Sequence, residues 1–182
     1  MEFIKCPIEG LFIIEPKIFG DLRGYFTETY RKELFEEHIG KVDWVQENQS
    51  KSVYGVLRGM HFQKGAFSQA KLVTVVSGKV LDVAVDLRKG SPTFGQYQAV
   101  ELSEENLRQF YIPRGFAHGF LVLSESAVFQ YKVDNVYAPQ SEGSLYWADE
   151  TVAIPWPFRE NLKLSEKDGN APRLGEYVFE EY

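Results

Sequence analysis

The stretch GVLRGMHFQ, residues 55–63, places Arg58 and His61 inside a segment that is otherwise apolar. Imidazole is the side chain whose charge changes most readily near neutral pH, so a histidine there is a candidate proton carrier. Alternation along a strand puts Arg58 and His61 on opposite faces. The two side chains reach one cavity only where the strand bulges, which Gly59 would permit. From the pattern alone, His61 is either a hydrogen-bonded core histidine or a functional one.

Four residues elsewhere have side chains suited to proton transfer or charge stabilisation, although each has a simpler interpretation. His118 in PRGFAHGF can line an interior or bond to backbone, the second being favoured, and Lys71 opens a strand-like run where an ammonium normally extends to water. Tyr131 suits aromatic packing, and Asp168 follows Ser165 as in a helix capping box. Together they offer a base, a cation, a phenol and a carboxylate, a set suited to moving a proton beside a carbonyl.

A metal site is the main alternative use of these histidines. The chain has three histidines and no His-x-His pair. His61, His118 and one carboxylate would still suffice for a two-histidine, one-carboxylate site, which we consider the minor alternative. The third histidine, His38, lies beside acidic residues in a predicted helix and is expected on the surface.

Composition and charge limit the class of protein. The length of 182 residues, with 44% hydrophobic and 25% charged residues, indicates one folded domain over 1–182. A net charge of −6 argues against a nucleic-acid partner. No apolar run is long enough for a membrane helix, and the first residues lack a secretory signal pattern. The single cysteine, Cys6, makes a reducing cytoplasm the simplest location.

Short strand-like runs that end at Gly, Pro, Asn or Asp dominate the sequence and predict an all-β fold, a sandwich, jelly roll or barrel. The clearest run, 71–92, alternates on both sides of Ser77-Gly78 and predicts a hairpin. One helix is expected over 28–40, with Gly40 at its C-terminal end. From Pro155 onward the chain is expected to wrap around the core, with a helical turn at 165–168.

Seven motifs in order resemble the dTDP-4-dehydrorhamnose 3,5-epimerase family over nearly the whole chain. They are FGDLRGYFTET (19–29), VQENQS (45–50), GVLRGMHFQ (55–63), KLVTVVSGKVLDVAVDLRKGSPTFG (71–95), IPRGFAHGF (112–120), YKVDNVYAP (131–139) and LSEKD (164–168). The resemblance implies a cupin-type jelly-roll β-barrel and a homodimer. It also implies conversion of dTDP-4-dehydro-6-deoxy-D-glucose to dTDP-4-dehydro-L-rhamnose, for bacterial surface polysaccharides, without metal or cofactor.

The same resemblance assigns roles to individual residues. It implies four catalytic residues, namely His61 as base, Asp168 as its partner, Tyr131 as acid and Lys71 beside the ketone. It implies substrate contacts from Arg23 and Glu28 in the partner subunit's site, from Gln46, Glu47 and Asn48 to the nucleotide, and from Arg58, His118, Glu142 and Lys167. The segment 141–152, SEGSLYWADETV, departs slightly from the family pattern and leaves the catalytic set untouched.

Three other functions remain open from the sequence. The first is a 3- or 5-monoepimerase of another dTDP-4-keto-6-deoxy sugar. The second is a metal-dependent cupin oxygenase, and the third is a jelly roll that binds a nucleotide sugar without catalysis.

Overall fold

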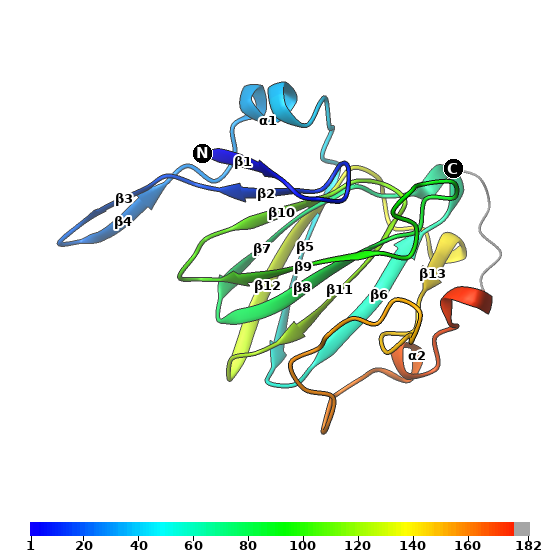
Figure 1. The fold of residues 1–182 in the computed structure, drawn as a ribbon. Helices are drawn as coiled ribbons and strands as arrows, with labels where there is room; N and C mark the ends of the chain where they lie inside the picture. The colour runs from blue at the N-terminus through cyan, green and yellow to red at the C-terminus, as the bar shows by residue number, and fades with distance from the viewer. Residues whose placement is uncertain (177–182) are drawn as a thin grey trace.

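Two antiparallel β-sheets face each other in the computed structural model of the chain, which describes residues 1–176 (Figure 1). The six-stranded sheet has the order β1-β2-β10-β7-β12-β5, and the five-stranded sheet has the order β13-β6-β11-β8-β9. A separate hairpin, β3–β4, belongs to neither sheet. The predicted all-β jelly roll with few helices is therefore confirmed.

The elements have the following bounds. The strands are β1 (Glu2–Lys5), β2 (Phe12–Glu15), β3 (Ile18–Asp21), β4 (Gly24–Thr27), β5 (Gln46–Val53), β6 (Leu57–Gln63), β7 (Lys71–Ser77), β8 (Lys79–Asp86), β9 (Tyr97–Ser103), β10 (Gln109–Ile112), β11 (Phe116–Val122), β12 (Ser126–Val133) and β13 (Glu142–Ser144). The α-helices are α1 (Lys32–His38) and α2 (Glu166–Gly169), and short 3-10 turns cover Gly65–Phe67, Pro139–Ser141 and Leu174–Glu176.

The main core lies between the two sheets and is built by alternation along the strands. From the six-stranded sheet it takes Val73, Val75, Phe110 and Phe129, and from the five-stranded sheet Val80, Ala84, Phe120 and Val122. All of these side chains are buried. Val83 and Val85 point to the other face of β8 and belong to a second apolar cluster on the outer face of its sheet.

The C-terminal segment covers that outer face, as predicted. Its side chains Leu145, Trp147, Trp156 and Leu174 pack in the same cluster as Val83 and Val85 of β8. The segment runs along the sheet below β6 before it reaches α2 (Figure 1). It therefore holds α2 against the sandwich from outside the sheets.

The N-terminal helix is shorter than the predicted range of 28–40. α1 spans Lys32–His38, and Gly40 follows it with a positive φ of +106°. Phe35 is buried against the outer face of the six-stranded sheet, with Tyr30 and Ile39 packed beside it. The apolar face and the terminal glycine were thus predicted, while the first residues of the predicted range remain non-helical.

The predicted hairpin over 71–92 is wrong. β7 pairs with β10 and β12, whereas β8 pairs with β9 and β11, so the two strands lie in opposite sheets. Gly78 makes the crossing with φ +80°, and a Cβ there would lie 2.1 Å from the carbonyl oxygen of Ser126. The chain passes from one wall of the sandwich to the other at this glycine.

Candidate active site

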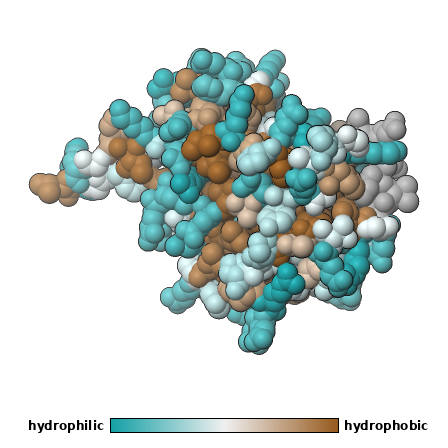
Figure 2. Space-filling model, viewed as in Figure 1, coloured by the Kyte–Doolittle hydropathy of each residue, from teal (hydrophilic) through white to brown (hydrophobic). Residues whose placement is uncertain are grey.

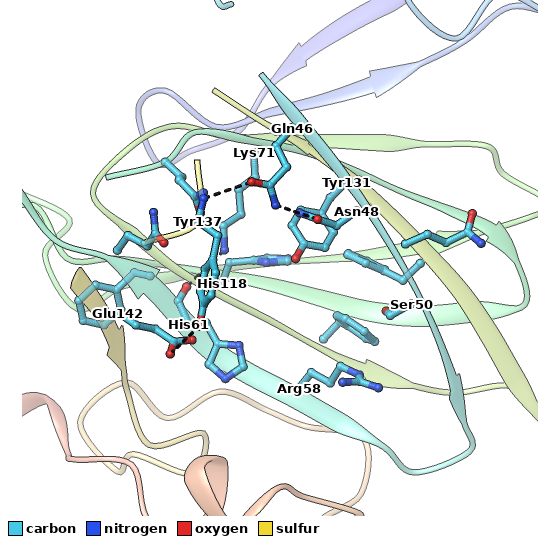
Figure 3. Close-up of a pocket in the computed structure, with 16 residues that line it drawn as sticks. Gln46, Asn48, Ser50, Arg58, His61, Lys71, His118, Tyr131, Tyr137 and Glu142 are labelled. Atoms are coloured by element: carbon cyan, nitrogen blue, oxygen red, sulfur yellow. Dashed lines mark hydrogen bonds between the residues drawn. The ribbon is translucent and has the colours of Figure 1, made fainter. Parts of the chain in front are cut away.

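A cavity of about 410 Å³ opens between the two sheets (Figure 3), which is within the range usual for small-molecule sites. Side chains enter it from both sheets. It is lined by Gln46, Asn48, Gln49, Ser50, Arg58, His61, Phe62, Gln63, Gln69, Lys71, His118, Phe120, Phe129, Tyr131, Tyr137 and Glu142.

His61 enters the cavity from β6 and is paired with Asp168 of α2. The His61 Nε2 lies 2.6 Å from the Asp168 Oδ1, although the residues are 107 positions apart. The Asp168 N–H donates to the Ser165 Oγ at 3.1 Å, so the predicted cap exists beside the pair. Burial alone would raise the pKa of Asp168, but bonds from His61, Ser165 and the Gly59 N–H lower it below its usual value. The ionised carboxylate therefore fixes the orientation of the imidazole.

Gly59 explains how Arg58 and His61 share one cavity. The pairing of β6 with β11 shifts its register between these two residues, which is the predicted irregularity. Gly59 has φ +135°, and a Cβ there would lie 2.5 Å from the Gly119 Cα. The Arg58 Nε then donates to the Ser52 Oγ at 3.0 Å. The strand thus presents a guanidinium and an imidazole to the same space.

His118 forms a second histidine–carboxylate pair, deep in the sandwich. Its Nε2 lies 2.9 Å from the Asp82 Oδ2 and 3.1 Å from the Oδ1. The favoured interpretation from sequence, a bond to backbone, is therefore wrong, and the interior position is correct. Burial lowers the pKa of His118, and Asp82 opposes this decrease. The lowered pKa favours the neutral imidazole.

Lys71 is buried, contrary to the favoured expectation that its ammonium extends to water. Lys71 is 8% exposed, and its Nζ lies 3.5 Å from the main-chain oxygen of His61. Burial lowers the pKa of Lys71 to about 8, while the charges of Asp82 and Glu142 oppose the decrease. The side chain therefore places a cation beside His61.

Tyr131 reaches the cavity from β12, in the sheet opposite His61 (Figure 3). Burial raises its pKa, and a hydrogen bond with Asn48 partly offsets the increase. Its ring packs against Phe129 with centroids 6.1 Å apart, so the packing interpretation also holds. At neutral pH the phenol retains its proton and is a donor.

Polar side chains of β5 and β13 line the wider part of the cavity. The Gln46 Nε2 donates to the Asn48 Oδ1 at 2.9 Å, and the Gln46 Oε1 accepts from the Tyr137 N–H at 3.1 Å. Glu142 forms an ion pair of 2.6 Å with Lys167 of α2. Lys167 also lines a depression that continues the cavity past His61.

Glu47 does not accompany its neighbours into the cavity. Alternation along β5 turns it to the other face, where it forms an ion pair of 2.8 Å with Lys132. The motif predicted three adjacent contacts, but a strand offers only every second side chain to one face. In this chain Gln46 and Asn48 line the cavity and Glu47 does not.

Arg23 and Glu28 also lie outside the cavity of their own chain. Arg23 lies at the turn of the β3–β4 hairpin, which projects from the sandwich (Figure 1). Its side chain pairs with Asp21 and is 89% exposed. Glu28 follows the hairpin and forms an ion pair of 2.9 Å with Arg31.

The hairpin also exposes large apolar and aromatic side chains. They are Ile18, Phe19, Leu22, Tyr25 and Phe26. Figure 2 shows hydrophobic surface at its tip. Contiguous exposed apolar surface of this kind is uncommon on monomeric soluble proteins.

Two residues of the site escaped the sequence analysis. Asp82 alternates into the same face of β8 as the core residues Val80 and Ala84. A carboxylate at a position where the strand pattern requires an apolar residue could have identified it. Tyr137 lies at the mouth, where its hydroxyl is 3.4 Å from the Glu142 Oε2. No pattern in its segment distinguishes it. His38 is exposed on α1, as predicted.

The arrangement suits proton transfer on both faces of a bound molecule. The His61 imidazole, oriented by Asp168, enters the cavity from the five-stranded sheet. The Tyr131 phenol and the buried Lys71 ammonium enter from the six-stranded sheet. Within residues 1–176, no group of three or more His, Cys, Asp or Glu residues is arranged to hold a metal ion. The same part of the chain contains no helix that is long and apolar enough to cross a membrane.

The chain matches a family model over most of its length. The model of the dTDP-4-dehydrorhamnose 3,5-epimerase family matches residues 5–176.

Individual proteins of this kind are similar over whole chains. The dTDP-4-dehydrorhamnose 3,5-epimerase of Salmonella typhimurium is 55% identical over 182 residues, which is 100% of both chains. The crystal structure of the enzyme from Elizabethkingia anophelis has a TM-score of 0.92 at 55% identity, covering 96% of this chain and 97% of that one. The dTDP-6-deoxy-D-glucose-3,5-epimerase of Legionella pneumophila, in complex with dTDP-4-keto-L-rhamnose, has a TM-score of 0.95 at 49% identity, covering 100% and 98%.

Proposed function

The chain belongs to the dTDP-4-dehydrorhamnose 3,5-epimerase family, and from this premise we propose that it inverts C3 and C5 of dTDP-4-dehydro-6-deoxy-D-glucose. The product is dTDP-4-dehydro-L-rhamnose, a precursor of dTDP-L-rhamnose. The observation that carries the proposal for the site is the 2.6 Å His61–Asp168 pair in a cavity that Tyr131 enters from the opposite sheet.

The C4 ketone makes the hydrogens on C3 and C5 acidic, because loss of either proton gives an enolate. His61 removes the proton, and Asp168 stabilises the imidazolium that forms and holds the ring in place. The Lys71 ammonium lies where it can meet the C4 oxygen, and a preorganised donor to developing negative charge contributes about 3 kcal/mol. Burial of Lys71 supports this role, since water does not screen its charge.

Epimerisation requires the proton to return on the opposite face of the ring. Tyr131 donates that proton in our proposal, and its location across the cavity from His61 supports the assignment. Because its pKa is raised, the phenol is protonated before the step. Proton transfer by one positioned group typically contributes 10²–10⁴-fold to the rate.

The nucleotide part of the substrate needs a separate set of contacts. Arg58 would meet the diphosphate, for which a planar guanidinium is well suited. The mouth residues Gln46, Asn48, Glu142 and Lys167 are available to the nucleoside, and His118 lines the deeper part. Glu47 is omitted from this set because it faces away.

We further propose that the enzyme is a homodimer in which the β3–β4 hairpin completes the partner's site. The exposed apolar side chains of the hairpin support contact with another subunit, and Arg23 at its turn would add a cation for the diphosphate.

The fold has one cysteine and does not depend on oxidation, so we place the reaction in the cytoplasm.

Product analysis in deuterated water tests the reaction. After incubation of the protein with dTDP-4-dehydro-6-deoxy-D-glucose, NMR should show deuterium at both C3 and C5 together with inverted configuration. Deuterium and inversion at one carbon would identify a monoepimerase. Absence of exchange, with the nucleotide sugar still bound, would identify a binding protein and overturn the proposal.

A further inference from the structure

Gln63 ends the motif GVLRGMHFQ and has no role in the proposed reaction. It is the last residue of β6, where it pairs with Glu142 of β13, and it alternates into the same face of the strand as His61. The residue lines the cavity and is nevertheless only 5% exposed. A buried amide is costly unless its donors and its acceptor find partners.

The amide of Gln63 bonds to three main-chain groups at the rim of the cavity. Its Nε2 donates to the carbonyl oxygens of Phe67 at 2.7 Å and of Val136 at 3.1 Å. Its Oε1 accepts from the Ala138 N–H at 2.7 Å. These partners fix the orientation of the amide, because the reversed amide would place its oxygen against two carbonyls and its NH2 against an N–H. Gln63 therefore uses both donors and its acceptor within the protein.

Residues 134–138, which two of these bonds hold, form neither strand nor helix. The segment is fixed by the Gln63 amide and by those of two further glutamines that line the cavity. The Gln69 Nε2 donates to the Asn135 carbonyl oxygen at 2.7 Å, and the Gln46 Oε1 accepts from the Tyr137 N–H at 3.1 Å. Without a strand or helix ladder, the conformation of this segment depends on these side-chain bonds.

The same segment carries Tyr137 to the mouth of the cavity. The Tyr137 hydroxyl lies 3.4 Å from the Glu142 Oε2, and Figure 3 shows Tyr137 between Gln46 and Glu142. Tyr137 lines both the cavity and the depression that continues it past His61. Because the residue is 55% exposed, packing holds its ring only in part. The main chain of the segment therefore decides where the ring lies.

We propose that Gln63 is a positioning residue that holds Tyr137 over the mouth of the cavity, where the nucleotide binds. The proposal rests on the proposed function for the identity of this ligand, a dTDP nucleotide. Gln63 acts through its main-chain bonds and does not bond to the ligand. A rim that is in place before the nucleotide arrives lowers the ordering cost of association and so strengthens binding.

Calorimetric titration with dTDP tests the proposal without turnover. Gln63→Met keeps the length of the side chain and removes its hydrogen bonds, so the Kd for dTDP should rise by about tenfold. Tyr137→Ala should raise Kd by a similar factor. Gln98→Met makes the same change on β9, where the amide donates to the Ala99 carbonyl oxygen at 3.1 Å, and should leave Kd unchanged. Wild-type affinity in Gln63→Met or in Tyr137→Ala would overturn the proposal.

The double variant Gln63→Met/Tyr137→Ala shows whether Gln63 acts through Tyr137. If it does, the double variant should bind dTDP within about twofold of Tyr137→Ala, because no ring is left to position. Multiplication of the two losses, to about a hundredfold, would show independent effects and would contradict the proposal.

Kinetics with the full substrate separate positioning of the rim from support of the whole site. Gln63→Met should raise KM by the same factor as Kd and leave kcat within about threefold. The reason is that the hydrogen bonds of Gln63 reach Phe67, Val136 and Ala138, which transfer no protons. A fall of kcat as large as the rise of KM would mean that Gln63 supports the whole site, against the proposal.

Hydrogen exchange of the wild-type protein tests the bonds of Gln63 with neither ligand nor variant. The Ala138 N–H should exchange as slowly as the amides of β6, because its acceptor is a buried side chain. The Val136 N–H, which donates to the neighbouring Asn135 Oδ1 at an exposed position, should exchange faster. Equally rapid exchange of the two amides would refute the inference. Failure of wild-type protein to bind dTDP would refute the proposed function instead, and the exchange rates would still decide whether Gln63 holds the rim.

Discussion

The molecule contains two histidine–aspartate pairs with the same contact and different surroundings. In both pairs an imidazole Nε2 faces a carboxylate, at 2.6 Å for His61–Asp168 and 2.9 Å for His118–Asp82. The side chains of the first pair are 35% and 4% exposed, and those of the second pair 8% and 0%. The first imidazole can meet a substrate and change its charge, whereas the second lies where a charge change is costly. The two pairs contain the same residue types, so the difference in burial makes His61 the candidate proton carrier and His118 a structural residue.

The two pairs also differ in how the chain assembles them. His118 and Asp82 lie on the adjacent strands β11 and β8, so one sheet fixes both. His61 lies in a sheet, but Asp168 comes from α2 in the outer segment. A pair made by one sheet is rigid, and a pair made across two layers depends on how the outer layer is held.

The largest expected effect comes from removing the partly exposed imidazole of His61. His61→Ala should lower kcat by about 10³-fold, within the usual contribution of a general base. Near-UV circular dichroism should remain that of the wild type, because His61 is only partly buried. His38→Ala, a change to a surface histidine on α1, is the matched control and should keep full activity. Activity of His61→Ala within tenfold of wild type would refute its role as base.

Removal of only the charge of its partner should have the next largest effect. Asp168→Asn keeps the size of the side chain but no longer stabilises the imidazolium, and kcat should fall by at least about 10²-fold, as for orienting carboxylates in other sites. Glu166→Gln, in the same helix but exposed, serves as control. Equal rates for the two variants would show that the His61–Asp168 contact is only structural.

The phenol should affect one carbon more than the other. In Tyr131→Phe, inversion at C5 should decrease by about 10²-fold and more than inversion at C3. NMR of products formed in deuterated water reports each carbon separately. Tyr54→Phe, which retains its stacking on Phe158, should change neither. Inversion of both centres at the wild-type rate would mean that Tyr131 only packs.

The cation on the projecting hairpin should affect binding and not chemistry. Arg23→Ala should raise KM by about tenfold with little change in kcat, as expected for one lost bond to a charged group. Lys41→Ala removes another exposed cation and should leave KM unchanged. Unaltered KM in Arg23→Ala would exclude the hairpin turn from the site.

The smallest expected effect is on the pH dependence of the free energy of unfolding, to which the two histidine–aspartate pairs should contribute in different pH ranges. His118 has a lowered pKa in the folded protein, so the unfolded chain binds the proton first as the pH falls below about 6.5. The free energy of unfolding should therefore decrease below that pH, by at most about 1.4 kcal/mol per unit from this group. Asp168, whose pKa is also lowered, contributes in the same direction only below about pH 4.

Urea titrations between pH 7 and 5 measure this difference. His118→Gln should flatten the slope in that range, whereas Glu166→Gln, which changes an exposed carboxylate of α2, should leave it unchanged. Equal slopes for His118→Gln and wild type would show that burial of the imidazole does not govern acid stability.

Much of the fold and part of the site followed from local patterns. Alternation predicted the strands, and Gly59 predicted the irregularity that brings Arg58 and His61 to one cavity, because both are properties of neighbouring residues. The Ser77-Gly78 turn was misread because a turn does not specify which sheet receives the next strand. That choice depends on β10 and β12, which lie far along the chain.

The electrostatic part of the site did not follow from spacing and pattern alone. Lys71 looked solvated because the charges that act on it, Asp82 and Glu142, come from other strands. The spacing around Asp168 indicated only a helix cap, and its pairing with His61 came from the family resemblance alone. Spacing reports contacts within an element, while charge pairs form between elements.

The chain reaches Asp168 through an exposed turn in the outer segment. Residues 159–161 are exposed and end in a turn just ahead of the bridge between Lys163 and Val56. A protease that cuts this turn would leave both sheets covalently intact and detach the carboxylate from its continuous tether. The His61–Asp168 contact would then depend on the non-covalent contacts of the outer segment alone.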